Sequence, residues 1–203
     1  MIAIIDYGMG NLHSVENALR KLDVECKVTS DPQDLMLADK LILPGVGAFP
    51  DCMKNLAASG VLDTLKEEVL VKKKPLLGIC LGMQALFEES EEGGLTKGLG
   101  FLKGRIVKMV DPEVKIPHIG WNLLEKQQDF ALFERLSKHP FVYYVHSYYA
   151  QGIEESDLIG YSRYGKLKIP GLVCHENVLG AQFHPEKSAE DGLAILTYFK
   201  EEF

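Results

Sequence analysis

A cysteine stands between two glycines in the run Gly78-Ile79-Cys80-Leu81-Gly82. The apolar residues before it predict a short strand and the spacing after it predicts a helix, so the cysteine would lie on the tight turn between them. Flanking glycines leave room for the cramped backbone of such a turn. A thiolate at a helix start also gains from the helix dipole and free amides. The pattern therefore predicts a nucleophile, although a small core residue is an equally common interpretation of this motif alone.

A base for this nucleophile is offered by His184, in the run Gln182-Phe183-His184-Pro185-Glu186 near the end of the chain. In extended backbone, residues two apart point to the same side, so Glu186 can orient the imidazole of His184. The proline between them adds no competing donor. The spacing fits a Cys-His-Glu triad, in which the carboxylate holds one ring nitrogen and the other faces the thiol. A lone His-Pro-Glu is more often an exposed loop, so the prediction depends on its pairing with Cys80.

A glycine-rich turn, Pro44-Gly45-Val46-Gly47, follows another apolar strand. Amides in such a turn can stabilise the oxyanion of a tetrahedral intermediate, and we expect Gly47 and Leu81 to supply the two donors. The alternative is an ordinary strand-to-helix turn.

The elements that must position these residues alternate between strand and helix in the first half of the chain. We expect strands at residues 2–5, 25–29, 40–43 and 75–79, and helices at 12–22, 32–38, 61–71 and 81–87. From residue 100 onward strands dominate, at 105–110, 141–149, 158–164, 172–175 and 178–183, before a final amphipathic helix at 189–199. This order predicts an α/β fold with a mainly parallel central sheet flanked by helices and extra antiparallel strands in the second half.

Composition narrows the class of protein. The 203 residues are 46% hydrophobic, which is enough for one core, so we expect a single domain over residues 1–203. The net charge of -7 is spread along the chain, without the basic patch of a nucleic-acid binder. The cysteines are scattered singly, which argues against a disulfide framework and a zinc site: Cys26, Cys52, Cys80 and Cys174. With neither a signal peptide nor a membrane span in the sequence, we expect a cytoplasmic protein with no metal and no cofactor.

The three motifs, and their order along the chain, resemble the landmarks of class I (triad) glutamine amidotransferases, and the resemblance runs essentially end to end. It implies the flavodoxin-like fold of that family. It also implies that Cys80 attacks the side-chain carboxamide of glutamine and that His184 protonates the leaving ammonia. Two further segments, residues 6–12 (Asp-Tyr-Gly-Met-Gly-Asn-Leu) and 117–122 (Pro-His-Ile-Gly-Trp-Asn), resemble signatures of the histidine-pathway glutaminases of the family.

The resemblance further implies which residues bind glutamine. Gln84 and Glu92 would contact the amino acid head of the substrate, and the backbone of Ser147 and Tyr148 would hold its carboxylate. Each has a simpler interpretation. The acidic run around Glu92 is typical of a solvated surface, and the aromatic-rich strand around Tyr148 is typical of a core.

The histidine-pathway glutaminases work with a separate cyclase subunit, a (β/α)8 barrel that uses the ammonia to make imidazole glycerol phosphate and AICAR. This chain has no second half resembling that barrel, so the resemblance implies a heterodimer with ammonia passing through the interface. Because free glutaminase activity would waste glutamine, and glycine lets a peptide rotate at little cost, we also hypothesise that the turn at residues 45–47 holds its amides misdirected until the partner binds its ligand. Trp121 is the expected hot spot, because a large amphipathic ring anchors interfaces well, and core packing is the alternative. The partner-facing candidates are Asn11, Pro117, His118, Gly120, Trp121, Asn122 and Lys187.

Two other functions stay open. A glutaminase of another pathway, such as pyridoxal phosphate synthesis, would have no use for the signature at residues 117–122. A redox-sensing α/β protein, in which Cys80 is oxidised rather than acylated, would leave His184, Glu186 and Gln84 without a role.

Overall fold

Eight strands form one central sheet in the computed structural model, which describes residues 1–203. Neighbouring strands are parallel from β2 through β1, β3 and β4 to β14, and antiparallel from β14 to β9. The predicted parallel sheet with antiparallel strands in the second half is confirmed. In spatial order the strands are β2 (Cys26–Thr29), β1 (Ile2–Ile5), β3 (Lys40–Gly45), β4 (Leu76–Cys80), β14 (Val178–Ala181), β13 (Leu167–His175), β12 (Leu158–Tyr164) and β9 (Glu125–Lys126).

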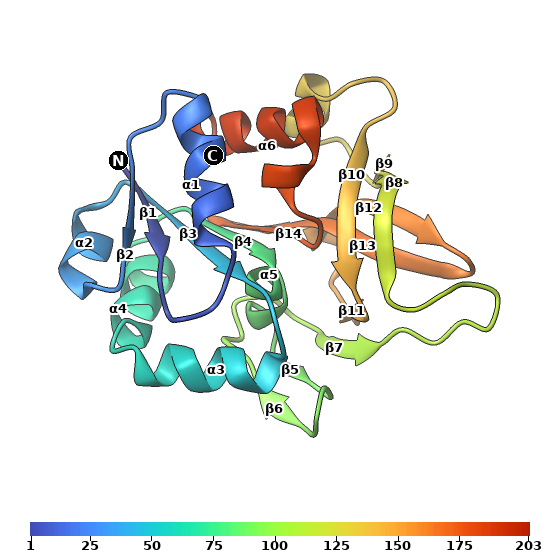
Figure 1. The fold of residues 1–203 in the computed structure, drawn as a ribbon, viewed down its shortest axis with the longest axis horizontal. Helices are drawn as coiled ribbons and strands as arrows, with labels where there is room; N and C mark the ends of the chain where they lie inside the picture. The colour runs from blue at the N-terminus through green and yellow to red at the C-terminus, as the bar shows by residue number, and fades with distance from the viewer.

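Helices cover both faces of this sheet (Figure 1). One face carries α1 (Leu12–Lys21) and α6 (Ala189–Glu201); the other carries α2 (Pro32–Leu37), α3 (Phe49–Ala58), α4 (Leu62–Lys66) and α5 (Leu81–Ala85). Each face has its own apolar core. Because successive strand residues point to opposite faces, Ile4 lies in the core under α1 and α6, and Ile5 lies in the other. Both cores rest on the same sheet, and the single domain stays a prediction.

Helix α3 is not among the predicted elements. Its N-cap residue, Ala48, has no side chain that can accept a hydrogen bond, and Pro50 in its first turn resembles a continuation of the glycine-rich turn before it. The carboxylate of Glu92 takes the place of the cap and accepts a hydrogen bond from the Phe49 N–H at 2.8 Å. No local pattern could announce this helix, because its capping group lies in a distant loop.

The strand predicted at residues 141–149 is two strands. β10 (Phe141–His146) pairs with β8 (His118–Leu123), whereas β11 (Tyr148–Gln151) pairs with β7 (Arg105–Lys108) in a separate sheet. Ser147 lies between them, and its carbonyl accepts a hydrogen bond from the Met109 N–H at 2.9 Å. The apolar pattern runs on across the break, so alternation alone cannot reveal the change of sheet. The second sheet is completed by β5 (Glu89–Ser90) and β6 (Thr96–Lys97).

Several boundaries differ from the predicted ones, most of them by one or two residues. Helix α5 ends at Ala85, and the helix predicted at 61–71 is α4 followed by the π-helical segment Glu67–Val71. Strand β13 begins at Leu167 rather than at residue 172. Its Pro170 pairs with Tyr161 beside a register shift, and such irregular positions tolerate a proline within a strand.

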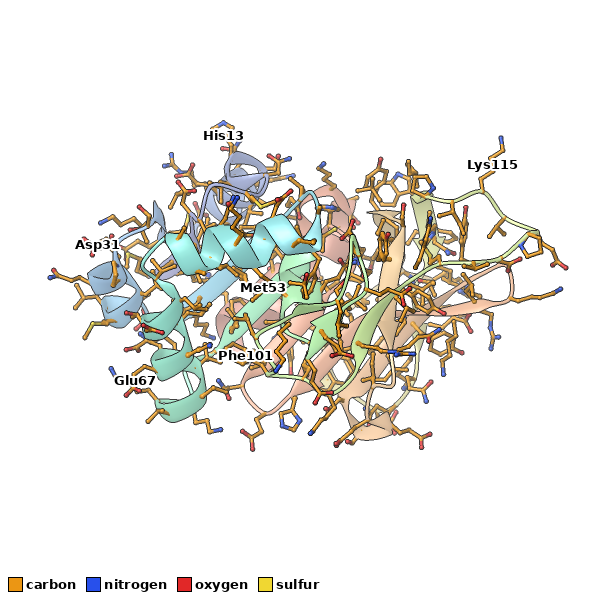
Figure 2. The ribbon with its side chains drawn as sticks, turned by 90° about the horizontal axis from the view of Figure 1, so that it is seen from below. His13, Asp31, Met53, Glu67, Phe101 and Lys115 are labelled. Carbon is orange, nitrogen blue, oxygen red and sulfur yellow. The ribbon has the colours of Figure 1, made fainter.

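The molecule is elongated along the sheet. Figure 2 shows Asp31, at the start of α2, near one end, and Lys115, on the loop between β7 and β8, at the other. Of the helices, none is both long and apolar enough to span a lipid bilayer.

Candidate active site

Cys80 is the last residue of β4 and directly precedes α5. Its backbone has φ 54° and ψ -110°, a conformation that a residue with a side chain adopts only under strain. Close packing behind it maintains this geometry, because a Cβ on Gly82 would collide with the carbonyl of Leu43 in β3. The structure thus has the strand, strained turn and helix that the glycine-flanked cysteine predicts. The helix is short, so the Leu81 amide at its start matters more than a long helix dipole.

His184 and Glu186 follow β14, and His184 Nδ1 lies 2.7 Å from Glu186 Oε1. Both side chains are buried, with 2% and 1% exposed. The reason that they meet differs from the predicted one. Pro185–Lys187 is a 3-10 turn rather than extended backbone, so the turn, and not strand alternation, brings the carboxylate back to the imidazole.

The electrostatic setting of His184 favours its charged form. Burial alone lowers the pKa of an imidazole, but the Cys80 sulfur and the Glu186 carboxylate beside His184 raise its pKa to about 10. Glu186 occupies Nδ1, while the buried Nε2 has no hydrogen-bond partner. This second nitrogen is therefore free to exchange a proton with a group that reacts at Cys80.

A cavity of about 420 Å³ opens onto Cys80. Two groups of residues that line it recur below. We call Cys80, Leu81, Gln84 and His184 the elbow wall. We call Pro117, Val145, His146, Ser147 and Tyr148 the hairpin wall, because they come from β8, β10, β11 and their ends. Val46, Gly47 and Glu92 complete the lining.

The predicted oxyanion donors lie at this cavity. In the β3–β4 register Gly45 stands opposite Cys80, which brings the turn Pro44-Gly45-Val46-Gly47 to the nucleophile. Gly47 is exposed and has φ 113°, a value that L side chains rarely adopt. Leu81 contributes the first amide of α5.

The predicted substrate residues also line the cavity, and two of them have additional roles. Gln84 is buried, and its Nε2 donates to the Tyr148 carbonyl and to Gln182 Oε1, both at 3.0 Å. Glu92 lines the cavity, and its carboxylate caps α3. Ser147 and Tyr148 meet the cavity where the chain leaves β10 for β11.

The sequence patterns do not single out Gln182, which is fully buried beside the nucleophile. Its Oε1 accepts from Gln84, and its Nε2 lies 3.9 Å from Cys80 Sγ. The sequence does contain a signal for Gln182. A glutamine within an apolar segment just before His184 is expected to be buried, and a buried amide needs hydrogen-bond partners.

The partner-facing candidates lie on elements that contact one another. Asn11 caps α1 by accepting from the Ser14 N–H at 3.4 Å, and α1 packs against the turn that carries Lys187. The same turn packs against β10, which pairs with β8. Trp121 is 51% exposed, so the core interpretation of this tryptophan is wrong.

One candidate is corrected by strand alternation. His118 is only 2% exposed, because it points to the inner face of β8 while Ile119 and Trp121 point outward. It is therefore not a surface residue. Asn122 shares the inner face, and its Nδ2 donates to the Arg163 carbonyl at 2.9 Å. Pro117 is exposed and lines the cavity, and Gly120 is half-buried.

Known proteins match the chain over nearly its whole length. The family described as glutamine amidotransferase class-I matches residues 3–200. The protein of Bacillus licheniformis named imidazole glycerol phosphate synthase subunit HisH is 51% identical over an alignment of 206 positions, which covers 99% of this chain and 96% of the relative. A protein of Bacillus cereus with the same name is 54% identical over 200 residues, 98% of this chain and 94% of the relative. A crystal structure of a glutamine amidotransferase shares the fold, with a TM-score of 0.78 and 22% identity. The match covers 99% of this chain and 98% of the chain in that structure.

Proposed function

This chain belongs to the class I glutamine amidotransferases, and we propose that it is the glutaminase subunit of an imidazole glycerol phosphate synthase in histidine biosynthesis. It hydrolyses glutamine to glutamate and ammonia. The observation that carries the proposal is the strained Cys80 at one cavity with a buried His184 whose other nitrogen is held by Glu186. Four unpaired cysteines fit a reducing compartment, so we place the enzyme in the cytoplasm.

The reaction runs through a thioester on Cys80. Cys80 gives its thiol proton to His184 as its Sγ bonds to the side-chain carbonyl carbon of glutamine, and the amides of Leu81 and Gly47 stabilise the resulting oxyanion. His184 gives a proton to the leaving nitrogen, which departs as ammonia. His184 then takes a proton from water as the water oxygen bonds to the acyl carbon, and it gives this proton to Cys80 Sγ as the carbon–sulfur bond breaks and glutamate leaves.

The two charged groups of the substrate, its ammonium and its α-carboxylate, would bind to different residues of the cavity lining. Glu92 is the carboxylate in the lining and would bind the ammonium group of glutamine. Backbone N–H groups of Ser147 and Tyr148 would bind its carboxylate. Gln84 would act mainly through the wall itself, because its amide nitrogen is already bonded to the Tyr148 carbonyl and to Gln182.

The ammonia acceptor is proposed to be a cyclase subunit with a (β/α)8 barrel. The outer face of the β8–β10 pair supports a docking site, because it exposes a contiguous apolar set of 38–58% exposed side chains that monomeric proteins rarely leave open. Val145 belongs both to this face and to the cavity lining, so the docked partner would stand at the cavity mouth. We call Ile119, Trp121, Phe141 and Val145 the outer patch.

Control by the partner is proposed to act on the turn at Gly47. Val46 and Gly47 are both exposed, and a Cβ on Gly47 would meet the flexible end of Met9 at 2.7 Å. The surroundings therefore leave the peptide free to rotate as long as residue 47 is glycine. Free turnover without the partner would waste glutamine, and such a rotation would prevent it.

A covalent probe tests the nucleophile directly. A diazoketone analogue of glutamine should alkylate Cys80 alone, because the other cysteines lie away from the cavity lining. Peptide mass spectrometry would locate the label, excess glutamine should prevent it, and Cys80→Ser should remain unlabelled. Labelling at Cys52 or Cys174 instead, or labelling that glutamine does not slow, would contradict the proposal.

A further inference from the structure

A chain of buried and part-buried hydrogen bonds runs from strand β8 to the hairpin wall. Asn122 Nδ2 lies 3.3 Å from His118 Nε2, and His118 Nδ1 lies 3.0 Å from His146 Nε2. His146 Nδ1 in turn lies 2.8 Å from the Tyr148 carbonyl oxygen. None of these groups belongs to the proposed triad, and the reaction described above does not use them.

The last acceptor fixes the direction of every bond in the chain. A carbonyl oxygen only accepts, so His146 must carry its proton on Nδ1, which leaves Nε2 as an acceptor. His118 must then donate from its own Nδ1, and its Nε2 accepts from the Asn122 amide. All four ring nitrogens of His118 and His146 then have a hydrogen-bond partner. This is the case only when both imidazoles are neutral.

Burial keeps the two rings in this state. His118 is stacked between Tyr144 and Tyr164, with ring centroids 4.5 and 4.0 Å away. Burial lowers the pKa of His118 to about 4 and the pKa of His146 to about 3. A second proton on either ring would set two donors against each other inside the protein, so each ring has one tautomer and one orientation.

The chain connects two surfaces of different purpose. At its inner end, the Tyr148 carbonyl also accepts from Gln84, which joins it to the elbow wall. At its outer end, His118 and Asn122 alternate along β8 with Ile119 and Trp121 of the outer patch. The same strand therefore presents the docking face outward and anchors the cavity wall inward.

We propose that His118 and His146 are positioning residues that hold the Ser147–Tyr148 segment in its glutamine-binding place and carry displacements of β8 to it. The inference rests on the proposed function, since it assigns the segment to glutamine. The Tyr148 carbonyl accepts two hydrogen bonds, one from His146 and one from Gln84. A shift of β8 that moves His118 and His146 would change the first of these bonds and with it the position of the carbonyl.

Two substitutions of one residue separate positioning from packing. His118→Phe keeps an aromatic ring between Tyr144 and Tyr164 but donates nothing to His146. His118→Asn loses the stack but places an amide nitrogen where Nδ1 was. Positioning predicts that Phe raises the KM for glutamine about tenfold, as expected for one lost buried hydrogen bond, with kcat changed less than about twofold. It also predicts that Asn restores the wild-type KM.

A packing role predicts the reverse order, with His118→Phe near wild type and His118→Asn impaired. Both variants would be assayed in complex with the cyclase partner, after urea unfolding has shown that each is folded. Equal KM values in the two variants, beside an active wild-type protein, would overturn the positioning role and leave the glutaminase function standing.

Nitrogen NMR of the histidine side chains supplies a readout that needs no activity. The full chain should show His118 and His146 with the proton on Nδ1, unchanged between pH 6 and pH 8 by the reasoning on bond direction. A proton on Nε2 of His146 would overturn the proposed hydrogen-bond chain, whether or not the enzyme is active. The expected tautomers in a wild-type complex that leaves glutamine intact would overturn the proposed function, and the assigned role with it.

Discussion

The elbow wall and the hairpin wall face the same cavity but are held by different forces. At the elbow, backbone packs on backbone, with Gly82 against the Leu43 carbonyl and Gly45 opposite Cys80 in the strand register. At the hairpin wall, side-chain hydrogen bonds from His146 and Gln84 hold one carbonyl. Close packing admits one arrangement, whereas a hydrogen bond contributes only about 0.5–1.5 kcal/mol and can shift. We therefore expect the fold to fix the position of Cys80 in the elbow wall, and partner binding to shift the hairpin wall.

The largest effect should come from crowding the elbow. In Gly82→Ala, the new methyl group must displace the Leu43 carbonyl from β3, and we expect a loss of more than about 4 kcal/mol in the free energy of unfolding. Urea unfolding would measure it. Gly60→Ala is the control, because Gly60 has no atom within 4 Å, so its loss should come from its positive φ of 79° alone and amount to about 1 kcal/mol. Equal losses would show that the elbow is not closely packed.

The chemistry of the elbow wall depends on a charge that can be removed without changing shape. In Glu186→Gln the pKa of His184 should fall, because the carboxylate that supports its protonated form is gone. By analogy with other triads, kcat should drop roughly 10³–10⁴-fold while the KM for glutamine changes little. Steady-state kinetics of the complex would test this. A loss below tenfold would remove Glu186 from the triad.

The hydrogen-bond chain that supports the hairpin wall should make the stability of the protein sensitive to acid. The ordinary pKa of an unfolded histidine is about 6.5, and burial holds that of His118 near 4, so the unfolded chain binds the extra proton between these values. This contribution to stability is complete above pH 6.5 and is lost as the pH falls toward 4. His184 acts in the opposite direction, since its raised pKa makes its contribution complete below pH 6.5 and lost toward pH 10.

His118→Asn should therefore lose about 2 kcal/mol less than wild type between pH 6.5 and 4.5 in urea unfolding. The groups that face His118 are neutral ones, namely His146, Asn122, Tyr144 and Tyr164. His13→Asn is the control for the same substitution at an exposed position, because the His13 side chain is 83% exposed. Parallel losses in the His118 variant and wild type would mean that His118 is not buried in a neutral form.

The smallest effect concerns Glu92, which belongs to neither wall. Glu92→Ala removes the cap of α3 and should lower the free energy of unfolding by about 1 kcal/mol, whereas Glu92→Gln keeps an acceptor and should lose only a few tenths. Both variants lose the charge proposed to bind the substrate ammonium, so both should raise the KM for glutamine. A normal KM in Glu92→Gln would restrict Glu92 to the cap.

The two walls also differ in how far the sequence predicts them. The elbow can be predicted from residues 78–82 alone, because its strand, turn and helix are adjacent in the sequence and its glycines indicate close packing. The hairpin wall does not, since the break at Ser147 and the pairing of His118 with His146 depend on which strands become neighbours. The same holds for α3, whose cap is Glu92, and for Gln182, whose partners come from other elements. Long-range side-chain hydrogen bonds leave no periodic pattern in a sequence.

Glutamate release is the most direct measurement of the central claim. It would be followed for the purified chain alone, for the chain with a cyclase barrel and its nucleotide ligand, and for the Cys80→Ala variant of that complex. The account predicts turnover that requires Cys80 and that rises when the partner and its ligand are bound. Turnover that survives Cys80→Ala, or no turnover with the barrel demonstrably bound, would contradict it.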